Sequence, residues 1–192
     1  MNKKIAFVSG SRSDYRYLHN ILVHLKKINY ESFEFIVTGS HLDSRFGKTV
    51  NEIKLDGIDI NREISLFDFE SNIKIPYQIS LGIKSISNYF EETKPSLIVI
   101  AGDRYEILAV AISAFFLDLE IVHIGGGETT FGSKDNSIRH CISKLAKYHF
   151  PSNKDAEKLL INFGIDKKNI FCLGSTGLED FYSYEPMKKN VL

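Results

Sequence analysis

Short apolar runs and longer amphipathic stretches alternate along the chain. The runs at 5–8 and Leu97–Ala101 are almost purely apolar, which is typical of buried strands. Between such runs, apolar residues recur at helical spacing, and one expected helix ends before Pro95. Further strands are expected at 33–37, 120–124, 148–150 and 170–173. Helices are expected around 15–25, 77–93, 106–117, 136–146 and 154–163, with a short helix and an irregular edge segment within 49–64.

This alternation of strands and helices predicts an α/β fold, in which helices cover both faces of a parallel sheet. The 192 residues contain no internal repeat or low-complexity linker, so one domain is the default expectation. Ligands of such sheets bind at the carboxyl ends of the strands. The polar residues that follow each expected strand are therefore the first candidates for a functional site.

Composition narrows the class of protein. The 24 basic residues balance 24 acidic ones, so no broad field favours nucleic acid or an anionic membrane as a partner. No apolar run approaches the roughly 20 residues of a membrane span, and the start of the chain lacks the features of a signal peptide. Cys141 and Cys172 belong to no CxxC pair, which favours reduced thiols and a cytoplasmic location.

The first two strand exits give one open question and one exclusion. In SGSRSDY, residues 9–15, small residues and a new helix favour a phosphate site assisted by Arg12, or equally a Ser/Asp helix cap with an exposed arginine. The stretch is not GxGxxG, which argues against a nicotinamide or flavin cofactor. Gly47-Lys48-Thr49 ends like a P-loop, but Leu42 stands where the first glycine is required. We therefore expect a surface loop there and no nucleoside triphosphate hydrolysis.

The third strand exit places Asp103 and Arg104 directly after a buried strand. With Glu106 three residues on, local pattern favours Asp103 as the N-cap of the next helix over a functional carboxylate.

The fourth strand exit is richer in polar groups. Gly125-Gly126-Gly127 permits unusual backbone angles and close approach, and Glu128 follows at the edge that Asp103 shares if the strands are sequential neighbours. Asp135 and Arg139 come at the start of the next helix. Several carboxylates and arginines around one crevice can support proton transfer beside an anionic leaving group.

A family resemblance runs from residue 5 to about residue 180. The stretches that carry it are GSRSDY, TGSHL, GDRYEILAVA, HIGGGETTFG, DNSIRHCISKLAKYHF and FCLGSTGLED. Together they resemble the amino-terminal half of the UDP-N-acetylglucosamine 2-epimerases, most of all the hydrolysing branch of sialic and related nonulosonic acid synthesis. The resemblance implies the glycosyltransferase-B architecture, two Rossmann-like domains facing across a cleft. Residues 1–180 would then be the amino-terminal Rossmann-like domain, and 181–192 the start of an interdomain linker or a truncated end.

The resemblance also implies a reaction that needs no cofactor and no metal. UDP leaves the sugar anti to the proton on C2, a glycal forms, and water adds to release N-acetylmannosamine. Asp103, Glu128 and Asp135 would be the catalytic carboxylates, with Asn136 standing where relatives usually carry another. The implied substrate-binding residues are the glycines that would make room for the sugar, the arginines at the nucleotide and pyranose sides, and an arginine that organises the carboxylates: Gly126, Gly127, Arg12, Arg16, Arg104 and Arg139.

Family members run to about twice this length, so their carboxy-terminal domain is an expected partner of this chain. We expect the chain alone to fold but to turn over poorly. A homo-oligomer is also compatible with the sequence. Two alternatives stay open: a noncatalytic or acceptor-binding domain of a glycosyltransferase-B protein, and an epimerase whose substrate is a UDP-2,4-diacetamido-trideoxy sugar.

Overall fold

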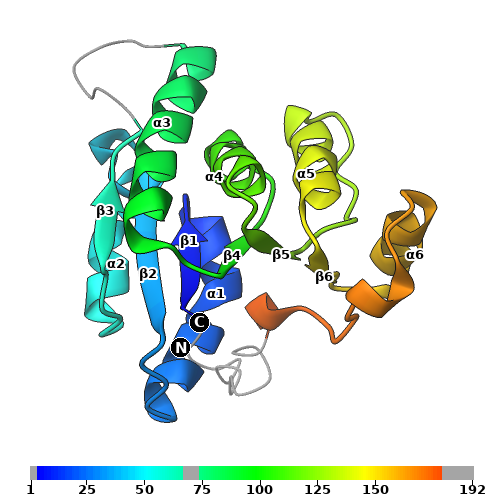
Figure 1. Ribbon diagram of the computed structural model, residues 1–192, viewed down its shortest axis with the longest axis horizontal. Helices are drawn as coiled ribbons and strands as arrows, with labels where there is room; N and C mark the ends of the chain where they lie inside the picture. The colour runs from blue at the N-terminus through cyan, green and yellow to red at the C-terminus, as the bar shows by residue number, and fades with distance from the viewer. Residues whose placement is uncertain (1–3, 67–73, 179–192) are drawn as a thin grey trace, which may run out of the picture.

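A single parallel sheet organises the part of the chain that the computed structural model describes, residues 4–66 and 74–178. Within those residues, six strands pair in the order β3-β2-β1-β4-β5-β6 (Figure 1). The strands are β1 (Ile5–Ser9), β2 (Phe33–Thr38), β3 (Arg62–Ile64), β4 (Leu97–Ala101), β5 (Glu120–Ile124) and β6 (Tyr148–Phe150). The strand order and the all-parallel pairing confirm the predicted α/β, Rossmann-like class.

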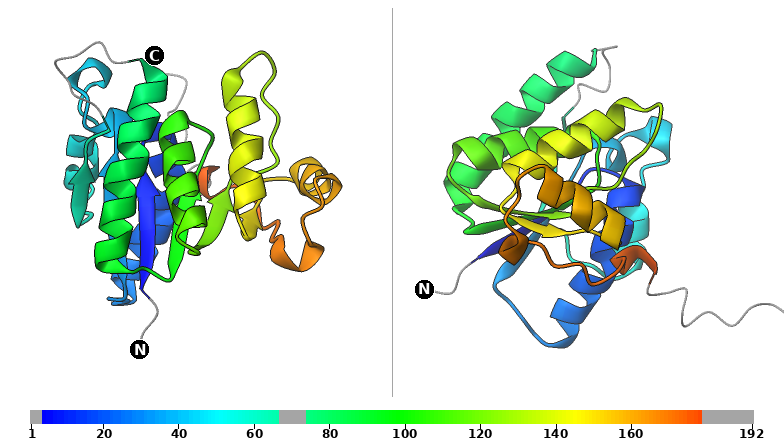
Figure 2. Two further views of the ribbon diagram at one scale, coloured as in Figure 1. Left: turned by 45° about the horizontal axis from the view of Figure 1, so that its top comes forward. Right: turned by 90° about the vertical axis from the view of Figure 1, so that its right-hand side faces the viewer.

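Helices cover both faces of this sheet, as predicted. Helices α3, α4 and α5 lie side by side over one face, and α1 and α2 lie over the other (Figures 1 and 2). Helix α6 lies beyond β6 at the edge of the sheet. Their bounds are α1 (Arg12–Lys27), α2 (Val50–Leu55), α3 (Ile75–Thr93), α4 (Tyr105–Phe116), α5 (Lys134–Leu145) and α6 (Lys154–Asn162).

The apolar side chains form one buried layer on each face. Phe90, Val110 and Ile142, from three different helices, pack with the strands on the α3–α5 face. Leu18 and Ile53 do the same from α1 and α2 on the opposite face. Two-sided burial explains why the strands read as unbroken apolar runs, because neither face of the sheet is left to polar residues.

The expected last strand at 170–173 is not formed. Ile170 makes only an isolated bridge to His149, and the Phe171 amide donates a hydrogen bond to the His149 carbonyl at 2.8 Å. Beyond that point the chain leaves the edge, and Leu173 is 82% exposed. The apolar run at 170–173 is used instead for contacts such as the stacking of Phe171 on Phe150.

The strand order indicates the part of the sheet edge where a ligand would be expected to bind. Strand β1 pairs with β2 on one side and with β4 on the other, so the chain reverses its direction of winding between β1 and β4. In open parallel sheets this switch point is where ligands bind, just outside the carboxyl ends of the strands. The turns after β1, β4 and β5 are therefore the turns that build the site.

No described helix is long and apolar enough to cross a membrane. The residues expected to start a linker, 181–192, lie outside the described part of the chain.

Candidate active site

Asp103 and Arg139 form the centre of a partly exposed cluster at the ends of β4 and β5. The side chain of Asp103 is 20% exposed and that of Arg139 is 9% exposed, and Arg139 Nη2 donates to Asp103 Oδ2. Arg139 Nη1 donates to the Glu128 carbonyl at 2.9 Å and to Thr130 Oγ1 at 3.1 Å. One guanidinium therefore fixes both the carboxylate after β4 and the loop after β5.

Glu128 belongs to the same cluster through its side chain. Its Oε1 accepts a hydrogen bond from Ser152 Oγ, and it lies 3.9 Å from the position a Cβ would take on Gly125. The Tyr17 ring, from α1, lies 4.0 Å from the same point. Burial and then the nearby Glu128 raise the pKa of Tyr17, so its hydroxyl keeps its proton at neutral pH. We call Asp103, Glu128, Arg139 and Tyr17 the open cluster.

The glycines before Glu128 pack against the protein itself. A Cβ on Gly126 would lie 2.9 Å from His123 Nδ1, and one on Gly127 would lie 2.4 Å from the Ala156 carbonyl oxygen. Gly127 also has φ +78°, which disfavours any side chain. The space that a Cβ would take on these glycines is filled by protein atoms, and the expectation that the glycines make room for a sugar stays a prediction. They let β5, His123 and α6 approach closely, and only their backbone remains to meet a ligand.

A second carboxylate cluster lies one strand away, at the switch point between β1 and β4. Asp14 is 1% exposed, and its Oδ2 accepts a hydrogen bond from the Gly10 amide at 3.2 Å. Ser11 is the N-cap of α1 and accepts from the Asp14 amide. The predicted Ser/Asp helix cap is thereby confirmed. Asp14, the acidic residue of this cap, accepts a hydrogen bond from the Gly10 amide, which a phosphate oxygen could otherwise accept.

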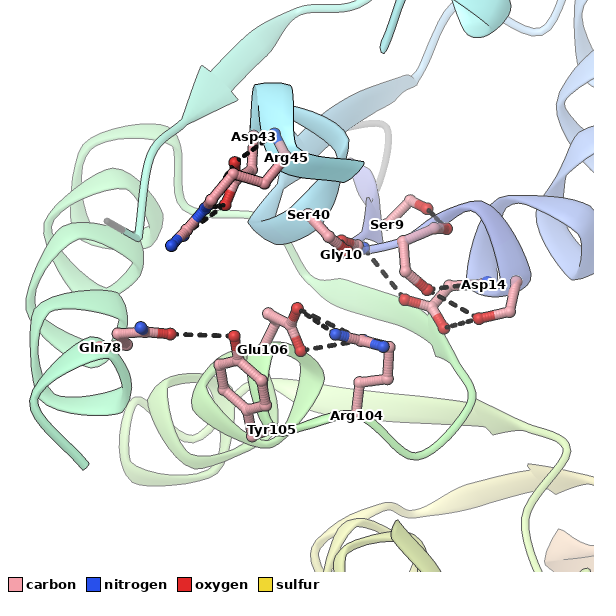
Figure 3. Close-up of polar contacts among 12 residues, drawn as sticks. Ser9, Gly10, Asp14, Ser40, Asp43, Arg45, Gln78, Arg104, Tyr105 and Glu106 are labelled. Atoms are coloured by element: carbon pink, nitrogen blue, oxygen red, sulfur yellow. Dashed lines mark hydrogen bonds and ion pairs between the residues drawn. The ribbon is translucent and has the colours of Figure 1, made fainter. Parts of the chain in front are cut away.

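Glu106 and Arg104 complete this second cluster (Figure 3). Glu106 is fully buried, and its carboxylate accepts from Arg104 Nε at 3.2 Å and from Nη2 at 3.0 Å. Figure 3 shows the Arg104 guanidinium between Glu106 and Asp14. Burial, with a smaller contribution from Glu106, raises the pKa of Asp14 to about 7, against the opposite effects of Ser11 and Arg104. We call Asp14, Arg104 and Glu106 the buried cluster.

The expected N-cap role of Asp103 is wrong. The N-cap of α4 is Arg104, whose side chain makes no capping hydrogen bond, and Glu106 is bound by that arginine. Asp103 is instead turned toward Arg139. The carboxylate is thus free of a capping duty, which is the arrangement that the functional interpretation requires.

Asp135 and Asn136 differ in their surroundings. Asp135 is exposed in the first turn of α5, and its amide donates a hydrogen bond to the hydroxyl of Ser133, the N-cap residue. Asn136 Oδ1 accepts a hydrogen bond from the Thr130 amide at 3.0 Å, so the amide side chain holds the loop that follows Glu128. The catalytic role expected for Asp135 stays a prediction.

Arg12 and Arg16 project from a different side of α1. The Arg12 side chain is 74% exposed and pairs with Glu52 at 3.1 Å. Both arginines line a hollow of about 240 Å³ whose other walls include His19 and Asp56. This hollow is separate from the open cluster, and the expected contact of these arginines with a diphosphate stays a prediction.

Gly47-Lys48-Thr49 forms part of an exposed loop, as predicted. Gly47 ends a short 3₁₀ turn in a left-handed conformation, and Lys48 is exposed. The Thr49 hydroxyl faces His41 Nδ1 at 2.8 Å. The loop therefore lacks the strand-to-helix setting of a P-loop.

Sequence reasoning gave Asp14 and Glu106 only capping roles, and it did not single out Tyr17 or Ser152, the residue that donates to Glu128. Asp14 carried one usable signal, since Ser11 and Asp14 have the spacing of a capping box. Both cysteines are free. Among the described residues, no group of three or more His, Cys, Asp or Glu side chains is arranged to hold a metal ion.

The fold defines a class first: a Rossmann-like α/β domain of the kind found in glycosyltransferase-B type proteins, with carboxylates and an arginine gathered at the strand ends. The profile of the UDP-N-acetylglucosamine 2-epimerase family matches residues 24–192. The chain therefore belongs to that family.

Named relatives agree with this placement, and a solved structure shares the fold. The chain is 34% identical over 192 residues to UDP-N,N'-diacetylbacillosamine 2-epimerase (hydrolyzing) of Legionella pneumophila, covering all of this chain and 51% of that protein. It is 37% identical over 174 residues to GDP/UDP-N,N'-diacetylbacillosamine 2-epimerase (hydrolyzing) of Campylobacter jejuni, covering 90% of this chain and 45% of that protein. The structure of UDP-GlcNAc 2-epimerase from Neisseria meningitidis bound to UDP-GlcNAc superposes with a TM-score of 0.81 at 20% identity, covering 91% of this chain and 47% of that one. The chain spans about half the length of the curated relatives it matches.

Proposed function

We propose that this chain supplies the acid–base half of a hydrolysing UDP-sugar 2-epimerase, in which it forms the amino-terminal domain. The observation that supports the proposal is that the Asp103 carboxylate and the Glu128 carbonyl, which follow neighbouring parallel strands, both bind Arg139, and that both carboxylates act on the nearby Tyr17. A pure binding domain has no need for two half-exposed carboxylates at this edge of the sheet. An elimination at C2 of a sugar does need them.

The proposed reaction balances with the groups at hand. One carboxylate removes the proton from C2 while the C1–O bond to the diphosphate breaks, so UDP departs and a glycal remains. The other carboxylate then directs water to C1 as a proton returns to C2 from the opposite side. We assign these tasks to Asp103 and Glu128, with Asp135 as the third carboxylate, and we assign Arg139 the task of holding the first two in register.

The remaining proposed binding residues are assigned to the sugar and to the diphosphate. Arg104 meets the pyranose region, the backbone of Gly126 and Gly127 lines its edge, and Arg12 with Arg16 meets the diphosphate. The relatives are about twice as long as this chain, and we propose that a second domain formed by the further length completes the cleft. We also propose that the enzyme acts in the cytoplasm, in sialic acid or related nonulosonic acid synthesis.

Two sugars are candidates for the substrate. UDP-N-acetylglucosamine is the substrate that the family as a whole suggests, and the complex of the Neisseria meningitidis relative contains it. The names of the Legionella and Campylobacter relatives favour a UDP-diacetamido-trideoxy sugar instead.

A domain exchange tests the proposal. Residues 1–192 replace the matching half of the Legionella relative, and released UDP is measured with each of the two sugars. The exchange protein should release UDP from at least one sugar and form the C2 epimer, and Asp103→Asn in the same protein should abolish most of that release. The isolated chain should release UDP barely above background, because losing the binding energy of the nucleotide lowers the rate as well as the affinity. Binding of both sugars by a well-folded exchange protein, without UDP release from either, would leave a noncatalytic domain as the better description.

A further inference from the structure

Asp14 lies where the turn after β1 meets the turn after β4. Its Oδ2 accepts from the Gly10 amide at 3.2 Å, which ties it to the first turn. Its Oδ1 lies 2.6 Å from the position a Cβ would take on Gly102, so the carboxyl is in close contact with the second turn. Because Asp14 is 1% exposed, protein groups and not water form its surroundings, and these include the two turns and the Ser13 hydroxyl, 3.5 Å from Oδ1.

Gly102 is held on its other sides by β5. Its amide donates to the Ile124 carbonyl at 3.1 Å, and its carbonyl accepts a hydrogen bond from His123 Nε2 at 2.8 Å. With φ +84°, it sits in a conformation that is natural for glycine. The next residue along the chain is Asp103, whose carboxylate meets Arg139. A shift of Gly102 is therefore passed directly to Asp103.

The charged groups that face Asp14 come from two helices. Glu106 faces it from α4 and Arg104 from the N-cap of that helix, and the charge of Asp14 is a small contribution that raises the pKa of Tyr17, one turn along α1. Glu106 is fully buried and bound by Arg104 through two nitrogens. Arg104 thus interacts with two neighbouring carboxyl groups, but it donates hydrogen bonds only to Glu106 and acts on Asp14 through its charge.

We propose that Asp14 is a positioning residue whose gain or loss of a proton sets the place of Gly102 and, through it, the place of the Asp103 carboxylate against Arg139. The role of Asp103 in this statement rests on the proposed function, whereas the mechanical link is a property of this chain. A protonated Asp14 is neutral and lies easily beside Glu106. An ionised Asp14 repels Glu106, attracts Arg104 and accepts a stronger hydrogen bond from the Gly10 amide.

The Asp14 carboxyl group gains or loses its proton near neutral pH. Burial, more than Glu106, raises the pKa of Asp14 to about 7. Two nearby histidines stay neutral over that range, because burial lowers the pKa of His123 to about 3 and that of His41 to about 4. His123 contacts Gly102 directly, so its constant charge removes the most immediate competing cause of a shift at Gly102.

The test follows the carboxyl carbon of Asp14 and the amides of Gly102 and Asp103 by NMR in the 192-residue chain, from about pH 5 to about pH 9. The expected result is one shared midpoint near pH 7 for all three signals. In Asp14→Asn the Gly102 and Asp103 amides should lose that midpoint, and in the control Asp155→Asn, at a side chain that is 91% exposed, they should keep it. An Asp14 midpoint near the ordinary value of about 4, or a Gly102 and Asp103 titration that persists in Asp14→Asn, overturns the proposal. If Asp14→Asn does not fold, the wild-type midpoints alone decide the outcome. Because no UDP-sugar is used, the result can be interpreted even if the proposed function is wrong.

Discussion

The open cluster and the buried cluster stand one strand apart and use the same residue types in opposite ways. In the open cluster the Asp103 side chain is 20% exposed, and one arginine reaches it together with the loop at Glu128. In the buried cluster Glu106 is fully buried and Asp14 nearly so, and Arg104 closes over Glu106. Carboxylates that reach solvent can exchange protons with a substrate, whereas buried carboxylates bind other groups of the protein.

This difference in exposure also predicts which substitutions affect catalysis and which affect stability. Removing a partner from a half-exposed pair leaves a group that water can solvate, but removing a partner from a buried pair leaves an uncompensated charge. We therefore expect substitutions in the open cluster to affect turnover first, and substitutions in the buried cluster to affect stability first.

The largest effect is expected at the open cluster. Asp103→Asn and Glu128→Gln, in the exchange protein, should each lower turnover by about 10²–10⁴-fold, the usual range for positioned acid–base groups. Stability should change little, because an amide oxygen at 103 still accepts from Arg139 and Glu128 is only half-buried. UDP release and thermal unfolding, measured on the same samples, check both parts. A destabilised Asp103→Asn with a normal rate would assign Asp103 a structural role.

The next effect is a loss of stability in the buried cluster. Arg104→Ala should cost about 3–5 kcal/mol, since it leaves the Glu106 carboxylate buried without a counterion. Arg139→Ala should cost less, about 1–3 kcal/mol, because water can reach Asp103. Denaturant unfolding of the two variants makes the comparison.

The control for that comparison removes both charges at once. The double variant Arg104→Met with Glu106→Gln should recover a large part of the loss, because no uncompensated charge remains. Equal costs for Arg104→Ala and Arg139→Ala would show that burial does not distinguish the two clusters.

A third effect is expected in the pH dependence of stability. Burial raises the pKa of Asp14 from 3.8 to about 7, so between those values the folded chain holds a proton that the unfolded chain has lost. Stability from this group is therefore fully present below about pH 4 and falls by roughly 1.4 kcal/mol per pH unit as the pH rises toward 7. Asp14→Asn should match the wild type near pH 4 and exceed it near pH 8. Unfolding curves at the two pH values, with Asp155→Asn as the exposed control, check this, and an equal deficit of Asp14→Asn at both pH values would contradict it.

Much of the open cluster follows from local patterns. The apolar runs place the exits after Ala101 and Ile124, and sequential pairing of β4 with β5 then brings Asp103 and Glu128 to one edge. The family motifs add Arg139. What the local pattern obscured was the choice at Asp103, since capping and catalysis both favour an aspartate directly after a strand.

The buried cluster depends on contacts that no local pattern contains. Asp14 is buried only because β1 pairs with β4, which brings Gly102 and Glu106 over the first turn. Likewise, the reason for Gly127 is the Ala156 carbonyl in a later helix. The run at 170–173 has strand composition, but strand formation there also requires a continuous ladder with β6, and the chain turns away after one bridge. In all three, the structure depends on contacts between residues that lie far apart in the sequence.

The smallest effect is expected at Asn136, at the rim of the open cluster. Its Oδ1 accepts from the Thr130 amide at 3.0 Å, and a carboxylate keeps that acceptor, so Asn136→Asp should leave the turnover of the exchange protein similar or raise it. Asn136→Ala loses the acceptor and should cost about 0.5–1.5 kcal/mol of stability with a modest loss of rate. Asp135→Asn, at the exposed neighbour, separates the two positions: if Asp135 is the third carboxylate, its loss lowers turnover far more than either change at 136. A large loss of turnover in Asn136→Asp would instead show that the amide nitrogen takes part in the site, and the rim would then belong to the catalytic group and not to the loop that supports it.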